Sequence, residues 1–391
     1  MSASGEGVPA DDSPNTVRKV SVVLPCLNEA KNIERCVTLA RGVLEQHQID
    51  GEVIVVDNNS SDGSGEIAAR AGATVIHEQR PGYGSAYLAG LDAARGKYIV
   101  MLDADLTYNF NDIPRFLASM EDGAEMVIGD RMDNIKPGAM RIHRRVGNWL
   151  LTGILNLLFD TGVRDAHCGM RALRADVLER LDLRTTGMEF ASEMVIRADK
   201  EKLRITQIPI EYSPRGGESK LLSFRDGPRH LRHMLLESPY HLFLLPGAVL
   251  VVPGGVVSVM ALAHIEVLGW RPELSALVAS SLVLILGAQI LAFGLCAHAH
   301  RLSLAGPVRG HWYEHMRMRL RLKHGLLFGL CVALVGMAIA IVLALQCLNH
   351  GFETLAQERA AIAAGTLLVL GIQIAFSSCL LTILGFRRTS P

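Results

Sequence analysis

The chain has 391 residues, with 39 Lys plus Arg and 39 Asp plus Glu, so its formal net charge at pH 7 is zero. This balance gives no argument for a nucleic-acid partner, and none is expected. Hydrophobic residues make up 49% of the chain but are unevenly distributed, because charges are dense up to about residue 238 and sparse beyond residue 240. The sequence therefore predicts a polar domain followed by an apolar one.

Residues 1–17 are rich in Ser, Gly, Pro, Asp and Asn and contain no apolar core. This composition is typical neither of a signal peptide nor of an N-terminal membrane anchor. We expect the segment to be disordered.

Short β-branched runs alternate with helical stretches over the next hundred residues. The predicted strands are Lys19–Leu24, which stops at Pro25, then Glu52–Val56, Thr74–His77 and Lys97–Leu102. The predicted helices run from Asn28 to about Gln46, from Gly65 onwards, and over Gly84–Arg95. Strands and helices that alternate at this spacing indicate βαβ units, so the sequence predicts an α/β domain with a mostly parallel sheet.

Polar residues follow three of these strands: Asn28 and Glu29, then Asp57, then Asp103 and Asp105. Each acid taken alone is explained by a helix cap or a solvated turn. In a parallel sheet, however, the strand ends lie along one edge, where α/β proteins bind ligands. Two carboxylates there would suit Mg²⁺ or Mn²⁺ holding a diphosphate.

The sequence Gly82-Tyr83-Gly84 precedes a predicted helix, so its backbone could approach a phosphate. It is not a dinucleotide-binding fingerprint, because no G-x-G-x-x-G follows the first strand.

Two later segments have the profile of helices at a membrane surface. Arg141–Arg145 is basic and Trp149–Phe159 is largely apolar, which predicts an interfacial helix, although a core helix fits almost as well. Residues 223–240 are predicted to form an amphipathic juxtamembrane helix, whose Arg225, Arg229 and Arg232 would meet anionic headgroups or an acceptor phosphate.

Four stretches without Asp, Glu, Lys or Arg follow: Leu242–Ala263, Leu274–Ala297, Leu326–Leu348 and Ala360–Phe386. Each is long enough for a helix that crosses a bilayer, and the alternative is four buried helices of a soluble core. The connection from His298 to His324 and the tail 387–391 are basic. By the positive-inside rule, both of them and the N-terminal domain are expected in the cytoplasm.

The motifs, taken in order, resemble family 2 glycosyltransferases of the GT-A fold. The resemblance rests on Pro25–Glu29, Val55–Gly63, Asp103–Asp105, Asp165–Ala172 and Arg215–Lys220. The last two motifs are similar to the polyprenyl-phosphate branch, typified by dolichyl-phosphate mannose and glucose synthases. The implied organisation is a GT-A domain over 18–222, the juxtamembrane helix over 223–240 and a four-helix transmembrane domain over 241–386.

The resemblance also implies roles for individual residues. Asp103 and Asp105 would hold Mg²⁺ or Mn²⁺, although Thr107 stands where related synthases have an additional Gln ligand. Residues expected to bind the nucleotide sugar are Pro25, Asn28, Glu29, Asp57, Arg80, Gly82, Gly84 and Ala104. Asp165 would lie near the sugar and the acceptor. Residues expected to contact the acceptor phosphate are Arg131, Arg171, Arg215, Ser219 and Lys220.

Without the family context, Arg131 would be read as part of a surface salt bridge and Arg215–Lys220 as a solvated loop. The implied reaction moves a hexose from a nucleotide sugar to a polyprenyl phosphate with inversion, and Asp103, Asp105, Asp165 and Arg131 are its expected catalytic residues. An anionic phosphate oxygen needs no strong general base, so no catalytic His is expected. UDP-glucose is slightly favoured over GDP-mannose, and packing of the transmembrane helices could support a homo-oligomer.

Two alternatives stay open. A processive polysaccharide synthase would carry an Arg-Trp pair, which this chain lacks. A non-catalytic scaffold or flippase subunit would have no reason to retain Asp103, Asp105, Arg131 and Lys220 together.

Overall fold

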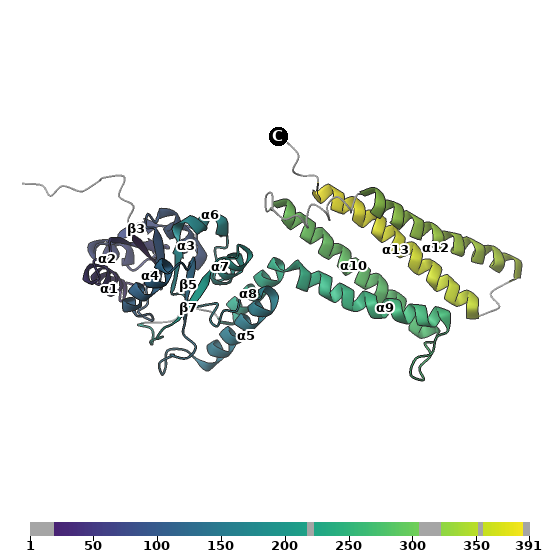
Figure 1. Cartoon of the computed structure of the whole chain (residues 1–391), viewed down its shortest axis with the longest axis horizontal. Coiled ribbons are helices and arrows are strands. Elements are labelled where there is room, and N and C mark those ends of the chain that lie inside the picture. Colours follow the sequence, from purple (N-terminus) through teal and green to yellow (C-terminus); the bar gives the residue numbers. More distant parts are fainter. Residues whose placement is uncertain (1–18, 217–222, 305–321, 351–354, 386–391) are drawn as a thin grey trace, which may run out of the picture. The chain divides into compact units, whose positions relative to one another are not determined.

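The computed structural model describes residues 19–216, 223–304, 322–350 and 355–385. The predicted disordered segment 1–17, the tail 387–391 and two predicted site residues, Ser219 and Lys220, lie outside these ranges. The chain divides into two compact units, Met1–Glu237 and Ser238–Pro391, which we describe separately (Figure 1).

A seven-stranded sheet forms the centre of the first unit, with the order β3-β2-β1-β4-β6-β5-β7. Its strands are β1 (Val20–Cys26), β2 (Gly51–Asp57), β3 (Thr74–His77), β4 (Tyr98–Met101), β5 (Met126–Asp130), β6 (Arg171–Arg174) and β7 (Ile205–Pro209). All neighbouring pairs are parallel except those of β6, which runs antiparallel to β4 and β5. The predicted α/β fold with a mostly parallel sheet is confirmed.

Helices pack against this sheet, and its central strands β1, β2 and β4 are almost entirely buried. They are α1 (Ile33–Gln46), α2 (Ser64–Arg70), α3 (Tyr83–Ala93), α4 (Ile113–Glu121), α5 (Ile142–Phe159), α6 (Leu178–Leu181), α7 (Phe190–Lys200) and α8 (Ser223–Glu237), with short 3₁₀ turns at η1 (Phe110–Asp112) and η2 (Ala175–Val177). Helix α1 contacts α2 and η1, whereas α3 contacts α7. Helix α8 packs on α5 and α7 within the first unit.

The first strand and helix differ from the prediction at their junction. Strand β1 continues through Pro25 to Cys26, where it pairs with β2. Proline has no backbone N–H to donate, but β4 pairs with β1 only up to Val23, so no hydrogen bond to β4 is lost at Pro25. Helix α1 begins at Ile33 rather than at Asn28. Asn28 has a φ of 50° and its Oδ1 accepts hydrogen bonds from Ser61, so it shapes a loop instead of starting a helix.

The strand register brings the predicted strand-end residues to one edge. Cys26 pairs with Asp57 across β1 and β2, and Val23 pairs with Met101 across β1 and β4. Asp103 and Asp105 come two and four residues after Met101, so the acids lie at the carboxyl ends of neighbouring parallel strands, where this class of sheet binds ligands.

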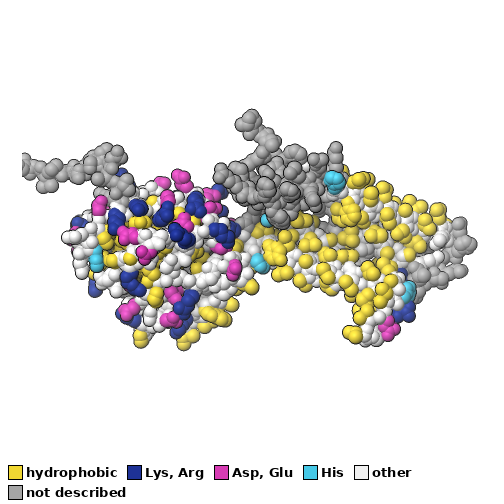
Figure 2. Space-filling model, in the orientation of Figure 1, with side chains coloured by type: hydrophobic (Ala, Val, Ile, Leu, Met, Phe, Trp, Pro, Cys, Tyr) yellow, Lys and Arg dark blue, Asp and Glu magenta, His cyan; other side chains and the backbone are white. Residues whose placement is uncertain are grey.

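The second unit is helical among its described residues. It contains a π-helical turn, η3 (Tyr240–Leu244), followed by α9 (Leu245–Ala263), α10 (Leu274–Leu304), α12 (Leu322–His350) and α13 (Leu355–Gly385). Four segments of these helices are long and apolar enough to cross a membrane: Tyr240–Ala263, Leu274–His300, His324–Gln346 and Gln357–Leu384. Figure 2 shows hydrophobic side chains over most of the described surface of this unit, as expected for helices that face lipid.

Small residues let these helices approach closely. A Cβ atom on Gly371 of α13 would overlap the backbone of Ala333 in α12, and one on Gly254 of α9 would overlap α10 at Leu284. Close backbone approach is a usual source of helix association in lipid, where no hydrophobic effect operates between helices. A hydrogen bond between Gln289 and Gln373 also links α10 to α13.

Candidate functional site

Two neighbouring carboxylates form the centre of the site, half-buried Asp103 and buried Asp105. Asp103 follows β4, and its Oδ1 accepts a hydrogen bond of 3.0 Å from the hydroxyl of Tyr83 at the start of α3. Oδ1 of Asp105 accepts from the Thr107 hydroxyl at 2.5 Å and from the Thr107 backbone at 3.1 Å. Thr107 therefore orients Asp105.

Burial raises the pKa of Asp103 to about 6, and the adjacent negative charge of Asp105 acts in the same direction. The raised pKa shows that the ionised form of Asp103 is unfavourable there, and a cation would stabilise it. The space beside Asp103 is kept open by Gly169, where a Cβ atom would overlap Asp103 Oδ2.

This chemistry fits a divalent metal held by Asp103 and Asp105. Hard oxygen ligands suit Mg²⁺ and Mn²⁺, which commonly bind through one or two carboxylates together with substrate phosphates. Among the residues that the structure describes, no group of three His, Cys, Asp or Glu could hold a metal ion. The remaining ligands would have to come from the substrate, from water or from other side chains.

Arg215 lies over the same acids, between Glu29 and Asp105. Its guanidinium pairs with Glu29 Oε1, and Nη1 lies 3.5 Å from Asp105 Oδ2. Glu29 follows β1, and its second oxygen accepts from Asn32 at 2.9 Å. Because Asn32 also donates to the carbonyl oxygen of Gly216 at 2.7 Å, the segment after β7 is tied to the end of β1. Arg215 thus neutralises Glu29, which is expected to bind the nucleotide, and Asp105, which is expected to hold the metal.

A second group of polar residues surrounds Asp57 at the end of β2. Asp57 accepts from the backbone of Ser60 at 3.0 Å and lies 3.4 Å from Nδ1 of His77. Asn58, which was not predicted, donates to the carbonyl oxygens of Glu78 and Arg80 at 2.8 and 2.7 Å. These contacts hold the loops after β2 and β3 together at the same edge of the sheet. The Arg80 side chain itself is exposed and pairs with Glu78.

The glycines of Gly82-Tyr83-Gly84 lie close to a distant segment of the chain. A Cβ atom on Gly82 or Gly84 would overlap the carbonyl oxygens of Thr186 and Thr185, respectively. The Thr186 carbonyl also accepts from the backbone of Ser85 at 3.1 Å. Both glycines are thus needed for the close approach of Thr185 and Thr186, and their contact with a phosphate stays a prediction.

Arg131 and Asp165 form a buried bidentate ion pair. Nε and Nη2 of Arg131 donate to the two carboxylate oxygens at 2.6 and 2.8 Å, and the Arg131 backbone N–H donates at 3.3 Å. Tyr108 and Tyr212 enclose the guanidinium, with Nη1 3.4 Å from the Tyr108 hydroxyl and the Tyr212 ring centroid 5.0 Å away. Burial acts to raise the pKa of Asp165, but the Arg131 charge and the hydrogen bonds hold it below its ordinary value.

Arg171 differs from the prediction. Its side chain is fully enclosed, and it donates to the carbonyl oxygens of Cys168, Ala191 and Ala166 at 2.8, 2.9 and 2.7 Å. These contacts tie β6 to α7 and to the loop after Asp165. The guanidinium is committed to the protein backbone, so the expected contact with an acceptor phosphate is contradicted.

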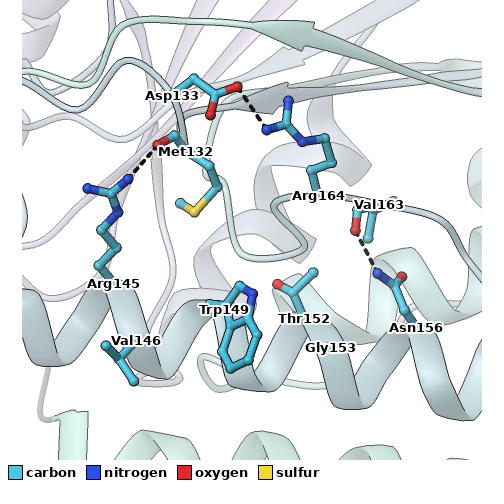
Figure 3. Close-up of a pocket in the computed structure, with 10 residues that line it drawn as sticks. All are labelled: Met132, Asp133, Arg145, Val146, Trp149, Thr152, Gly153, Asn156, Val163 and Arg164. Carbon is cyan, nitrogen blue, oxygen red and sulfur yellow. Dashed lines mark hydrogen bonds and ion pairs between the residues drawn. The ribbon is translucent and has the colours of Figure 1, made fainter.

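A cavity of about 560 Å³ lies along helix α5, and its lining includes Met132 and Arg164, the sequence neighbours of Arg131 and Asp165 (Figure 3). Its lining combines apolar, small and charged residues: Met132, Asp133, Arg145, Val146, Trp149, Thr152, Gly153, Asn156, Val163 and Arg164. Arg164 pairs with Asp130 and Asp133, each at 2.8 Å. Arg145 donates to the Met132 carbonyl at 3.2 Å and pairs with no carboxylate within the described part of the chain. The cavity thus offers apolar walls and an available cationic group.

Helix α5 leaves large apolar side chains exposed. Asn148, Thr152 and Leu155 are buried, whereas Ile142, Trp149 and Leu157 are 82%, 71% and 75% exposed. The outward face of a soluble helix is usually polar. The structure therefore favours the interfacial helix over the core helix, since an exposed apolar face on this scale marks a partner or a lipid surface.

Several residues of the site escaped the sequence analysis. Tyr83, Tyr108, Tyr212, Asn58 and Asn148 all contact predicted residues, yet they come from separate loops and helices. Only Asn58 and Tyr83 carried a signal, since they lie within the motifs Val55–Gly63 and Gly82-Tyr83-Gly84. Pro25 and Ala104 lie at the strand ends as expected.

Comparison with known proteins agrees with this geometry. Residues 21–182 match the model of Glycosyl transferase family 2, and residues 296–385 match that of the family 2 C-terminal transmembrane region. The chain is 41% identical over 94% of its length to the low-salt glycan biosynthesis hexosyltransferase Agl6 of Haloferax volcanii, of which it covers 89%. It is 36% identical over 45% of its length to a dolichyl-phosphate hexose transferase of the same organism, of which it covers 76%.

Among solved structures, the chain is similar to glucosyl-3-phosphoglycerate synthase from Mycobacterium tuberculosis, which was crystallised with Mn²⁺, UDP and glucosyl-3-phosphoglycerate. The identity is 22%, the match covers 56% of this chain and 80% of the other, and the TM-score is 0.47. The extent of the Agl6 match, together with the two family models, establishes the family. The chain belongs to glycosyltransferase family 2 and is a membrane glycosyltransferase of the GT-A fold.

Proposed function

We propose that this glycosyltransferase moves a hexose from a nucleoside diphosphate sugar to a polyprenyl phosphate, with a divalent metal and with inversion at the anomeric carbon. The observation that carries the proposal is the cavity on α5, which combines apolar walls with Arg145 and is lined by Met132 and Arg164, the sequence neighbours of Arg131 and Asp165. A lipid phosphate has the matching chemistry, namely an anionic head on an apolar chain. The dolichyl-phosphate hexose transferase among the relatives supports the same acceptor class.

The donor would bind along the carboxyl edge of β1, β2 and β4. Glu29 and Asp57 can accept hydrogen bonds from a base or ribose, and Pro25, Asn28 and Ala104 line the same edge. Asp103 and Asp105 would hold Mg²⁺ or Mn²⁺, which neutralises the charge that develops on the leaving nucleoside diphosphate. Arg215 must exchange partners for this to happen, because it now pairs with Glu29 and Asp105.

The acceptor phosphate would lie between the Arg131 guanidinium and Arg145. Asp165 fixes the plane of Arg131 by bidentate hydrogen bonds and leaves Nη1 as its donor toward Tyr108 and the site. In the reaction, a phosphate oxygen forms a bond to the anomeric carbon while the bond from that carbon to the diphosphate oxygen breaks. The phosphate is already anionic, so positioning and charge stabilisation carry the catalysis and no proton acceptor is needed.

Some parts of the proposal rest on the sequence alone. UDP-glucose is the first donor to test and GDP-mannose the second. Ser219 and Lys220 stay predicted phosphate contacts, and the cytoplasmic location of the catalytic domain and of the C-terminus stays a prediction from the basic loops. A homo-oligomer is likewise a prediction.

The decisive experiment is transfer by the purified full-length protein in detergent or nanodiscs. Radiolabelled UDP-glucose, GDP-mannose and related nucleotide sugars are each incubated with polyprenyl phosphate and Mn²⁺ or Mg²⁺, and the lipid product is extracted. We expect one sugar per lipid from one preferred donor. A polymeric product would favour a processive synthase, and no turnover with any donor would favour a non-catalytic scaffold or flippase subunit.

The matched controls are Asp103→Asn and Asp105→Asn, which keep the side-chain size but remove the charge. Wild-type rates in both variants would contradict the metal-dependent reaction.

A further inference from the structure

A chain of four polar side chains runs from Asp165 to helix α8 through the interior of the first unit. Nδ2 of Asn148 lies 3.0 Å from Asp165 Oδ1, and Oδ1 of Asn148 lies 3.0 Å from Nδ1 of His167. Nε2 of His167 lies 3.1 Å from the Ser192 hydroxyl oxygen, which in turn lies 2.7 Å from Nδ1 of His230. We call Asn148, His167, Ser192 and His230 the polar relay.

The carboxylate of Asp165, at one end of the relay, fixes the direction of the first two hydrogen bonds. Although burial opposes ionisation, Arg131 lowers the pKa of Asp165, so this group is a carboxylate and can only accept. Asn148 must therefore turn its NH₂ group toward Asp165 and its carbonyl oxygen toward His167. That oxygen also only accepts, so His167 must carry a hydrogen on Nδ1.

The remaining two bonds follow from the neutral state of His167. Burial, reinforced by the neighbouring His230, holds the pKa of His167 well below its ordinary value. A neutral imidazole with hydrogen on Nδ1 accepts at Nε2, so Ser192 donates to it. The Ser192 oxygen is then free to accept from Nδ1–H of His230. All four hydrogen bonds point the same way, toward Asp165.

We propose that the polar relay positions Asp165, and through it Arg131, for the transfer reaction. Its members are positioning residues, because they act through Asp165 rather than on the reacting atoms. The relay draws on three helices, with Asn148 on α5, Ser192 on α7 and His230 on α8. Helix α8 ends at Glu237, and the first candidate membrane span begins at Tyr240. The proposal rests on the proposed function and adds a physical link from the site to the helix that precedes the membrane domain in sequence.

The competing explanation is that these side chains only satisfy one another in a buried region. A purely structural role predicts that cutting the chain lowers stability and leaves kcat per folded molecule unchanged. Positioning predicts a loss in kcat, because small displacements of a catalytic group are costly. It also predicts that two cuts in the same chain cost little more than one, since interactions that act as a unit are not additive.

Transfer kinetics of the full-length protein separate these outcomes. Ser192→Ala is expected to lower kcat about tenfold with an unchanged KM for the donor. In a protein that already carries Asn148→Ala, the Ser192→Ala substitution should lower kcat by less than about a further twofold. His230→Asn keeps a donor near the position of Nδ1 and should preserve kcat, whereas His230→Leu should not.

Ser21→Ala is the matched control. Ser21 is a buried serine at the amino end of β1, at the edge of the sheet opposite to the site. It accepts hydrogen bonds from the backbone of Arg95 and Gly96 at 3.2 and 2.8 Å. Its loss should lower stability without lowering kcat. A kcat for Ser192→Ala within about twofold of wild type would overturn the positioning proposal.

The direction of the relay is measurable without any substrate. The ¹⁵N chemical shifts of histidine-labelled protein, assigned by the loss of one signal in a His167 variant, report which ring nitrogen carries hydrogen. We expect neutral His167 with hydrogen on Nδ1, and hydrogen on Nε2 would overturn the relay. Absence of sugar transfer by wild-type protein would instead overturn the proposed function, so the two failures are distinguishable.

Discussion

The first unit contains two buried charged centres that differ in how their charge is balanced. Asp103 and Asp105 share one strand end, and their mutual repulsion and burial raise the pKa of Asp103 to about 6. Arg131 and Asp165 form a complete ion pair in which every charge has a partner of opposite sign. Gly169 adjoins both centres: its backbone N–H donates to the Tyr108 hydroxyl at 2.7 Å, and a Cβ atom there would overlap Asp103 Oδ2.

This difference indicates what each centre can do. The acid pair would gain free energy by taking up a cation, which is why we propose it as the site for a metal and its diphosphate. The ion pair would gain nothing from a further cation, and Asp165 holds the Arg131 guanidinium in a fixed plane. In the proposed function, one centre receives a ligand and the other orients a hydrogen-bond donor.

The largest expected effect is on activity at the acid pair. Asp103→Asn or Asp105→Asn should reduce transfer by about 10³-fold or more, because the charge that binds the metal is lost. At the same time, Asp103→Asn should stabilise the metal-free protein at pH 7 by on the order of 2 kcal/mol, since it removes a carboxylate whose ionisation is unfavourable there.

Transfer assays and thermal unfolding with and without Mn²⁺ test this combination. A variant that is less stable than wild type in the absence of metal would contradict the assignment of excess charge to Asp103.

The second effect is on stability at the ion pair. Arg131→Ala leaves Asp165 buried without its charged partner and should cost about 3–5 kcal/mol in the free energy of unfolding. The control is Arg184→Ala, because Arg184 is 70% exposed and pairs with the exposed Asp182, so its ion pair should be worth at most about 1 kcal/mol.

Equilibrium unfolding of the detergent-solubilised protein measures both values. Equal losses for the two arginines would show that the Arg131–Asp165 pair behaves as a surface salt bridge.

The third effect is a pH dependence of opposite sign at the two centres. The pKa of Asp103 is raised, so its favourable contribution to stability is complete below about pH 4 and is lost as the pH rises through about 6. The pKa of Asp165 is lowered, so its contribution is present above about pH 4 and is lost only as the pH falls through its folded value.

Metal affinity is the practical measurement, because Mn²⁺ competes with the proton on Asp103. We expect Mn²⁺ to bind about tenfold more weakly at pH 5 than at pH 7 in wild type. Asp165→Asn, the matched variant at the other centre, should retain the same pH dependence of Mn²⁺ binding.

The smallest effect concerns the cavity on α5. Arg145→Gln should raise the KM for a polyprenyl phosphate acceptor several-fold, because it removes one charge-assisted hydrogen bond, and Trp149→Ala should raise it by loss of apolar contact. The KM for the nucleotide sugar should not change in either variant. Arg70→Gln, on α2, provides a surface control with the same loss of charge.

Kinetics with acceptors of different chain length sharpen this test. If Trp149→Ala affected the donor KM as strongly as the acceptor KM, the cavity would not be an acceptor site.

The amino-acid sequence predicted the α/β fold, the four long apolar helices and the acids at the strand ends, because each depends on local pattern. Strand periodicity and turn residues place Asp57, Asp103 and Asp105 after strands, and parallel pairing then brings them to one edge. Helix length and composition alone identify the candidate spans. The motifs also predicted the resemblance to family 2 glycosyltransferases, which the comparisons confirmed.

Only the tertiary structure decided how the cationic and polar residues are used. Arg131 and Arg171 are both buried arginines, but Arg131 binds Asp165 and Arg171 binds three backbone carbonyls. Gly82 and Gly84 are required by Thr185 and Thr186, which lie about a hundred residues further along the chain. Such roles depend on which distant segments pack together, and one-dimensional spacing carries no record of those contacts.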